Sequence, residues 1–522
     1  MRISNSQIRI VSLLLVFYYI IMAWLLHRSG YEHSESLFYA EKLKLLFEYK
    51  ENTLLTLGTT YPSTFFIGSI VFSPFGYLFA PIATSIVMMS VLYFFMVKDI
   101  NDSNLPIKTL FICITILFFL HPMFIFSAVS GRNVAGIMLF FYMLFRSLFN
   151  YYKSQTTYYL SLASIYLTGL IFTEINFLWM LLSFFPFVML ISIEGIKVSK
   201  EEPFVFQYFQ ALNNRSLRRK LANRTVALYL ILFLLPLGAV YLFRTLNAAH
   251  AGDATYFLTS QYANWRVTGT TALNTILEGV NGSNISMQTQ IIFQTFTVFL
   301  APLFILSLIL FRGKLYELFT ILTPLIFFSI ILVDVKYYFT VEYYIIINLI
   351  GIAALTFFGA ERFGKKLTPI LLVGTTVLSL FAGVYYFNET NDQEEQDFLS
   401  SLTKVEQVFE PKKSSELQQV ADYVATVATN KTPVLIDDAS AFGIVAHLQT
   451  LDGLVLPMQK SFVTVIENPV LTAQYIVVAK RNNRLHNFTV LNAYNIGIMK
   501  ERLKLSTYRV FETNNWIIYS IR

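Results

Sequence analysis

The stretch RSGYEHSESLFYAEKLKLLFEYKENTLLTLGTTYPSTFFIGSIVFSPFG, residues 28–76, decides the fold. A long apolar run precedes it, and a series of apolar runs follows it. The stretch begins polar and acidic, becomes amphipathic, and is apolar again after Tyr61-Pro62. This order predicts a polar loop and an amphipathic helix held between membrane spans.

The composition indicates an integral membrane protein. Of the 522 residues, 55% are hydrophobic and only 14% are charged, whereas soluble proteins carry about 25% charged residues. The apolar residues lie in runs close to the roughly 20 residues that cross a bilayer. The net charge of +7 comes mostly from short loops between these runs, where basic residues set topology. We therefore expect a lipid bilayer, and no nucleic acid, as a partner.

Eleven apolar runs are candidate spans. They cover residues 8–26, 79–97, 108–127, 134–149, 157–173, 176–193, 225–243, 290–311, 316–333, 343–359 and 367–386. The first is too long for a typical signal peptide and has no small-residue cleavage site, so we expect it to be retained. A further run, Pro62–Phe75, is too short for a full span and is expected to be re-entrant or interfacial.

The positive-inside rule supports eleven spans with a cytoplasmic N-terminus. With that parity, the basic loops fall on the inner face: residues 98–107, 150–156, 194–224, 312–314 and 361–366. Counting 62–75 as a span would move the strongly basic 194–224 loop outside. The outer face then holds residues 28–78, 130–133, 173–176, 244–289, 334–342 and everything after about 387.

The chain after residue 387 changes in composition. A helical pattern at 414–427 is followed by short β-rich runs at 433–436, 475–479, 508–511 and 516–521, the last two flanking a hairpin signal. Asp437-Asp438 follows the first of these runs and is expected to cap a helix. We predict two domains: a transmembrane domain over 1–386, with 28–78 as its first outer loop, and a small extracytoplasmic α/β domain over 387–522.

Three residues directly after the first span, Glu32, His33 and Glu35, are candidate functional groups. A carboxylate in a loop walled by helices can act as a general base toward a hydroxyl or amine. The alternative is an ordinary solvated loop. The following amphipathic segment, Leu37–Tyr49, suits an interfacial helix or, equally, a packing helix.

Other polar residues lie at span ends on the same predicted face. Arg132, Asn133 and Glu174 are candidates because ionisable groups at membrane depth are costly, although helix capping also explains them. Arg266 and Lys336 could bind a phosphate, although interfacial anchoring explains them as well.

Several kinds of site are not indicated. The six histidines form no zinc-binding pair, and the single cysteine, Cys113, permits no disulfide within the chain. No phosphate-binding loop or dinucleotide fingerprint is present. We expect neither a metal ligand set nor a bound cofactor, although a divalent metal remains open.

The order of these features resembles the opening of the GT-C-fold glycosyltransferases that use polyprenyl-phosphate sugars, including protein mannosyltransferase-like enzymes and lipid A aminoarabinose transferases. Their pattern is an acid, a tyrosine and a proline motif, and here Glu35, Tyr39 and Tyr61-Pro62 are similar to it. The likeness extends through His121-Pro122 to Arg132-Asn133 and on to Glu174. Two departures are that glutamate replaces the commoner aspartate, and that Arg132-Asn133 stands where some members carry a second acid.

The resemblance implies a mostly α, polytopic GT-C-like membrane bundle with about eleven spans, one re-entrant or interfacial helix and a small C-terminal α/β domain. It also implies an inverting hexosyl- or pentosyltransferase with Glu35 as the catalytic base. The substrate-binding residues would be Glu32, His33, Tyr39, Tyr61, Arg132, Asn133, Glu174, Arg266 and Lys336.

The expected donor is a polyprenyl-phosphate-linked sugar, and the expected acceptor is an envelope glycan, lipid or protein. The predicted location is a bacterial plasma (inner) membrane, with the C-terminal domain extracytoplasmic. Two alternatives stay open. One is a transporter or flippase, although the chain shows neither inverted repeats nor midplane charges. The other is a non-catalytic scaffold of an envelope-glycan assembly machine.

Overall fold

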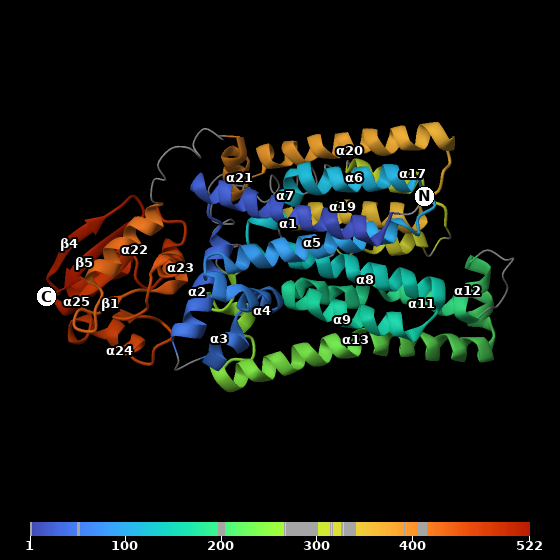
Figure 1. Ribbon diagram of the computed structural model, residues 1–522. Helices are drawn as coiled ribbons and strands as arrows, with labels where there is room; N and C mark the ends of the chain where they lie inside the picture. The colour runs from blue at the N-terminus through green and yellow to red at the C-terminus, as the bar shows by residue number, and fades with distance from the viewer. Residues whose placement is uncertain are drawn as a thin grey trace, which may run out of the picture.

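The computed structural model describes residues 3–49, 53–196, 204–265, 267, 301–313, 315, 317–324, 327, 341–390, 392–403 and 415–521. Long helices lie side by side in a bundle, and a small sheet domain sits beyond one end of it (Figure 1). The mostly α membrane architecture with a C-terminal sheet, predicted from the sequence, is confirmed.

The bundle is built from helices whose bounds follow the predicted spans closely. They are α1 (Asn5–Arg28), α5 (Ala80–Ile100), α6 (Ile107–Leu120), α7 (Pro122–Val129), α8 (Val134–Ser154), α9 (Thr157–Thr173), α10 (Met180–Ser183), α11 (Phe185–Ile196), α13 (Arg215–Ala251), α17 (Pro302–Ile309), α19 (Val341–Phe358) and α20 (Gly364–Glu389). Most of the predicted spans 290–311 and 316–333 lies outside the described residues.

Five described helices are long and apolar enough to cross a membrane, or up to seven if each bent pair counts as one span. The first bent pair, α6 and α7, turns by 58° at His121-Pro122, because a proline cannot continue the hydrogen-bond ladder of a helix. The second pair, Ile175–Ser183 and Phe185–Ile196, turns by 45°. Among the described residues, α9 and the segment Ser63–Phe75 are apolar but shorter.

Large apolar side chains on the outer helices face away from the protein. On α1, Phe17 is 58% and Trp24 53% exposed; on α20, Phe381 is 68% exposed. An apolar surface of this kind is unfavourable in water. It is the surface expected of helices that contact lipid.

One predicted loop contains helices instead. The segment 194–224 holds α12 (Phe204–Asn213) and the first turns of α13, which is 37 residues long. At 1.5 Å per residue, α13 spans about 55 Å, so it extends beyond the roughly 30 Å hydrocarbon layer. The sequence marked only the apolar middle of this helix.

Loops that the positive-inside rule assigns to the same face of the membrane contact one another at the same end of the bundle. At one end, the Ile3 amide donates to Asn101 Oδ1 at 2.9 Å, and the Arg224 guanidinium donates to Gln155 Oε1 at 3.0 Å. At the other end, the Tyr61 amide donates to the Ala263 carbonyl at 2.8 Å. The short helices α2 (Ser34–Glu48), α3 (Thr53–Thr59), α4 (Ser63–Phe72) and α21 (Gln393–Thr403) lie at this second end, next to the sheet domain (Figure 1).

The sheet domain has five strands in the order β2-β1-β3-β5-β4. The strands are β1 (Val434–Leu435), β2 (Leu454–Val455), β3 (Tyr475–Ala479), β4 (Thr507–Glu512) and β5 (Trp516–Ile521). β1 pairs in parallel with β2 and β3, whereas β5 is antiparallel to β3 and β4. The β4–β5 hairpin was predicted from the sequence, but the two-residue strand β2 was not.

Short helices complete this domain: α22 (Glu416–Val427), α23 (Asp438–His447), α24 (Phe462–Glu467) and α25 (Ala493–Leu503), with α14 (Tyr256–Thr259) in the loop after α13. The side chain of Asp437 caps α23 by accepting from the Ala439 amide at 3.1 Å, as expected.

The predicted domain boundary at 386/387 falls inside α20. Helix α21, just beyond it, belongs with the bundle because Phe398 packs into the large apolar core of the spans. The sheet domain therefore begins with α22 and its N-cap, Ser415.

Helix α2 is not an interfacial helix, which corrects one of the two readings of 37–49. Helix α23 of the sheet domain covers its polar face, so Glu41, Lys42 and Lys44 are buried. Lys42 Nζ lies 2.9 Å from Glu41 Oε2 and 3.5 Å from Asp438 Oδ2. Lys44 Nζ donates to the carbonyl of Ala446 at 2.9 Å, near the end of α23, where a cation interacts favourably with the helix dipole. Helix α2 thus joins the two parts of the protein.

This joint gives a testable expectation. Lys42→Met should lower the free energy of unfolding of the sheet domain by about 3 kcal/mol, because two buried carboxylates would lose their cation. Thermal unfolding and limited proteolysis of the purified protein would measure it. Lys480→Met is the matched control: it breaks a partly exposed pair with Glu512, which should cost less than about 1 kcal/mol. Equal losses in the two variants would contradict the role given to Lys42.

Candidate active site

The first turn of α2 is shaped by His33 and Glu35. His33 is the N-cap residue, and its Nδ1 accepts from the Glu35 amide at 3.1 Å. This bond satisfies one of the free N–H groups at the start of the helix. The negative charge of Glu35 in the first turn also complements the helix dipole. The polar start of the 28–76 stretch therefore fixes the orientation of Glu35.

Glu35 is a buried carboxylate whose two oxygens both accept hydrogen bonds. Its Oε1 accepts from the Tyr39 hydroxyl at 3.2 Å and from the Asn133 amide at 3.1 Å. Its Oε2 accepts from Arg132 Nε at 3.1 Å. The residue is only 1% exposed. Four of the predicted site residues, Glu35, Tyr39, Arg132 and Asn133, are thus brought together.

Arg132 lies in the turn between α7 and α8. Besides Glu35, its guanidinium contacts Glu395 Oε1 through Nη1 at 3.4 Å and lies 5.5 Å from the centre of the Phe126 ring. Asn133 fixes the same turn by donating from Nδ2 to the Thr173 carbonyl at 3.0 Å. This turn therefore places the cation beside Glu35.

Two acids on α21 complete the cluster and were missed in the sequence. Glu395 also accepts from the Tyr386 hydroxyl at 3.0 Å and from Thr390 Oγ1 at 2.8 Å. Glu394 accepts from the amide and hydroxyl of Ser34, and its Oε2 lies 3.1 Å from His33 Nε2. The available signal was an acidic pair soon after the last span, on the face that also holds Glu35.

Burial governs the charges of this cluster. It lowers the pKa of His33 well below its usual value, with a further contribution from Arg132, so the imidazole is neutral at neutral pH. Burial, with the charge of Asp392, raises the pKa of Glu394 to about 7.

Glu32 lies at the edge of the cluster. Its Oε2 is 3.0 Å from His447 Nε2 and 3.4 Å from the Ser415 hydroxyl, and its Oε1 is 3.9 Å from His27 Nδ1. Both His447 and Ser415 belong to the sheet domain. Glu32 therefore links that domain to the start of α2.

The remaining predicted residues have other hydrogen-bond partners or lie outside the described residues. Tyr61 is buried and donates to the Ile171 carbonyl at 2.8 Å, which ties the start of α4 to α9. Glu174 caps the turn that follows α9 by accepting from the Asn176 amide at 3.3 Å, as the capping alternative predicts. Arg266 and Lys336 lie outside the described residues.

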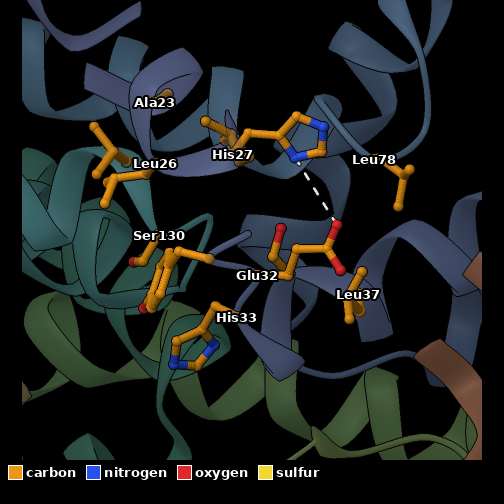
Figure 2. A pocket seen from close by; sticks show the side chains of 12 residues that line it. Ala23, Leu26, His27, Glu32, His33, Leu37, Leu78 and Ser130 are labelled. Carbon is orange, nitrogen blue, oxygen red and sulfur yellow. Dashed lines mark ion pairs between the residues drawn. The ribbon is translucent and has the colours of Figure 1, made fainter. Parts of the chain in front are cut away.

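A small pocket, partly open to solvent, lies beside the cluster, between the end of α1, the start of α2, the segment entering α5 and the end of α7. Figure 2 shows Glu32, His33 and Ser130 with apolar side chains, among them Leu26 and Leu78. Glu35 and Arg132 do not line it. Among the described residues, no three His, Cys, Asp or Glu side chains form a group that could hold a metal ion.

Comparison with known proteins returns solved structures only. No protein-family model and no curated protein matches the chain. ArnT from Cupriavidus metallidurans in the apo state is similar over 97% of both chains, with 11% identity and a TM-score of 0.47. ArnT from the same organism bound to undecaprenyl phosphate gives 10% identity and a TM-score of 0.48, also over 97% of both chains. ArnT is a lipid A aminoarabinose transferase with a GT-C fold, the kind of protein that the sequence pattern resembles.

The raised pKa of Glu394 predicts how firmly α21 packs against α2. Between about pH 4.5, the ordinary carboxyl pKa, and about pH 7, Glu394 binds more protons when α21 packs against α2 than when α21 is free. Packing should therefore be firmest below about pH 5 and should weaken as the pH rises to about 7. Hydrogen exchange of the α21 amides, corrected for intrinsic rates, would measure this change.

Glu394→Gln should remove most of that pH dependence. Glu389→Gln, at an exposed carboxylate, is the control and should leave it unchanged. An unaltered pH dependence in Glu394→Gln would show that another group is responsible.

Proposed function

We propose that this protein is an integral-membrane glycosyltransferase that moves a sugar from a polyprenyl-phosphate carrier to an envelope glycan, lipid or protein acceptor. The observation that carries the proposal is the Glu35 carboxylate, 1% exposed and 3.1 Å from the Arg132 guanidinium. This pair lies at the end of an apolar bundle, where a membrane-bound carrier would present its phosphate.

Glu35 is proposed as the general base. The acceptor oxygen forms a bond to the anomeric carbon, and its proton passes to the Glu35 carboxylate. The bond between the sugar and the phosphate breaks, and its electron pair leaves with the polyprenyl phosphate. Attack opposite the leaving group inverts the anomeric centre.

Arg132 is proposed as a ligand of the phosphate. A guanidinium can donate two parallel hydrogen bonds to phosphate and is always charged. Because its Nη1 lies 3.4 Å from Glu395 Oε1, the phosphate would replace Glu395 at this position. Binding of the carrier would then require α21 to shift. Arg266 and Lys336 stay proposed as further phosphate ligands.

The proposed orientation places α2 and the sheet domain outside a bacterial plasma membrane and the N-terminus in the cytoplasm. It is supported by the exposed side chains of Arg215, Arg218, Arg219 and Lys220, at the start of α13. They lie at the opposite end of the bundle from the sheet domain (Figure 1). Basic residues next to spans favour the cytoplasmic side.

A non-catalytic scaffold is the second candidate function, and one observation favours it. Both oxygens of Glu35 already accept hydrogen bonds within the protein. A cluster of this kind can also serve only to hold α2, α8 and α21 together. Donor binding separates the two functions, because a scaffold needs no affinity for a polyprenyl-phosphate sugar.

Glu35→Gln tests the enzymatic proposal. The amide preserves the size of the side chain but cannot take up the proton, so we expect transfer to fall at least about a hundredfold. Purified wild type and variant would be incubated with a panel of radiolabelled polyprenyl-phosphate sugars, and both binding and transfer would be measured. Retained donor binding with lost transfer is the expected result.

Tyr39→Phe is the matched variant, because it removes one hydrogen bond to Glu35 and leaves the carboxylate in place. It should lower transfer only modestly. Full transfer by Glu35→Gln would contradict the assignment of the base. Failure of the folded wild type to bind any donor would favour the scaffold.

A further inference from the structure

Helix α12 leaves an aromatic face uncovered. One side of it, with Tyr208, Ala211 and Leu212, packs into a small apolar cluster with α11 and the start of α13. The other side carries Phe206 and Phe209, which are 61% and 57% exposed. Residues three apart lie on the same side of a helix. The two rings therefore form one exposed aromatic surface at this end of the bundle.

The helix that follows begins with exposed cations and no compensating acid. The exposed cations are Arg215, Arg218, Arg219 and Lys220. Residues 204–251 contain no aspartate or glutamate, and the preceding residues, 197–203, hold two lysines and two glutamates and so carry no net charge. Like charges three or four residues apart on a helix repel one another. An anionic partner outside the helix would relieve this repulsion.

Two of the cations continue the lipid-facing side of α13. Val226, Leu230 and Leu234 follow one another at four-residue spacing and are 56%, 55% and 66% exposed. Arg219 and Arg215 lie about two and three helical turns before Val226. The same side of the helix therefore changes from basic to apolar along its length.

The position of this change matches the edge of a bilayer. The exposed apolar side chains of α13 extend from Val226 to Leu246, about 30 Å at 1.5 Å per residue, which is the thickness of the hydrocarbon layer. Arg219 stands about 10 Å beyond Val226, and the head groups occupy roughly 5–8 Å on each side. A long arginine side chain can reach back over the remaining distance. Helix α12 runs across this end of the long helices, opposite the sheet domain (Figure 1).

We propose that these side chains form a site for the head groups of anionic phospholipids in the adjacent leaflet. This α12–α13 patch consists of Phe206, Phe209, Arg215, Arg218, Arg219 and Lys220. The guanidinium groups would donate paired hydrogen bonds to lipid phosphates, and the phenylalanine rings would enter the boundary between head groups and acyl chains. The positive-inside rule requires cations on this side of the membrane. It requires neither exposed aromatic rings beside them nor their alignment with the lipid-facing side of α13.

Lipid titration tests the basic half of the patch. Phosphatidylglycerol and phosphatidylcholine with the same acyl chains would be added to the full-length protein in detergent, and the bound lipids measured by native mass spectrometry. We expect at least about tenfold tighter binding of phosphatidylglycerol, since each cation near an anionic surface contributes about fivefold. The combined variant Arg215→Gln/Arg218→Gln/Arg219→Gln/Lys220→Gln should reduce this preference to about twofold or less.

A matched variant at the other end of the molecule controls for net charge. Lys431→Gln/Lys460→Gln/Arg481→Gln/Arg484→Gln removes four exposed cations of the sheet domain and changes the net charge equally. It should leave the preference for phosphatidylglycerol as it is in the wild type. The same loss in both combined variants would show that net charge alone attracts the lipid and would overturn the patch.

Spin labels test the aromatic half of the patch. Phe206→Cys and Phe209→Cys would be labelled in a Cys113→Ala background, with the protein in nanodiscs that contain phosphatidylglycerol. Both labels should be more accessible to oxygen, which concentrates in the bilayer, than to a water-soluble nickel chelate, and a label at the exposed residue Asp452 should show the reverse. Labels at 206 and 209 that are open to nickel would place this face in water and overturn the proposal. Labels shielded from both reagents would indicate a protein partner and would overturn it as well.

This inference does not depend on the proposed function, and donor binding separates the two. A combined α13 variant that loses its lipid preference but still binds a polyprenyl-phosphate sugar would support the patch as a separate site. A wild type that binds the donor without preferring phosphatidylglycerol would overturn the patch alone. A wild type that prefers phosphatidylglycerol but binds no donor would overturn the proposed function and leave the patch supported.

Discussion

The buried ion pair between Glu35 and Arg132 constrains the functional end of this molecule. Taking a carboxylate and a guanidinium out of water is expensive unless they bond to each other and their remaining polar atoms are satisfied. Here Tyr39, the Asn133 amide and Glu395 satisfy those atoms. The pair can exist only where α2, the turn between α7 and α8, and α21 meet. Its position therefore fixes the relative placement of three segments that are distant in the sequence.

Helix α2 carries this constraint into the sheet domain. Its first turn holds Glu35, and its middle buries Lys42 against Asp438 of α23. Glu32, just before the helix, contacts His447. A shift of the sheet domain would therefore move helix α2 and, with it, the Glu35 carboxylate. This gives the domain a role in positioning the site as well as in covering the bundle.

The sequence predicted which polar residues lie on one face better than it predicted the packing around them. Glu35, Arg132 and Asn133 stand next to span ends, and the loop charges assigned them to one face. Ionisable groups near a membrane are costly, so their positions in the sequence are informative. The pattern did not show that Tyr61 bonds to the Ile171 carbonyl and Glu174 to the Asn176 amide, because these partners are set by local and tertiary packing. The bend between α6 and α7 has a cause in the sequence itself, Pro122, since the effect of proline on a helix is local.

The missed features depend on contacts between segments far apart in the chain. Nothing in the local sequence reveals that α23, about 400 residues later, covers Lys42 and Lys44. Nothing in the local sequence distinguishes Glu394 and Glu395 from other charges beyond a span, and only the folded structure shows their contacts with Ser34 and Arg132. The burial of the Ser130 and Tyr31 hydroxyls without a hydrogen-bond partner among the described residues has no sequence signature, since the pocket forms only when four segments come together.

The most direct test of the central claim is a structure of the protein in nanodiscs with a bound polyprenyl-phosphate sugar. Our account predicts that the phosphate contacts Arg132 in place of Glu395, that α21 is displaced, and that Glu35 remains beside the anomeric position. A phosphate bound elsewhere, with the Glu395–Arg132 contact intact, would contradict the account.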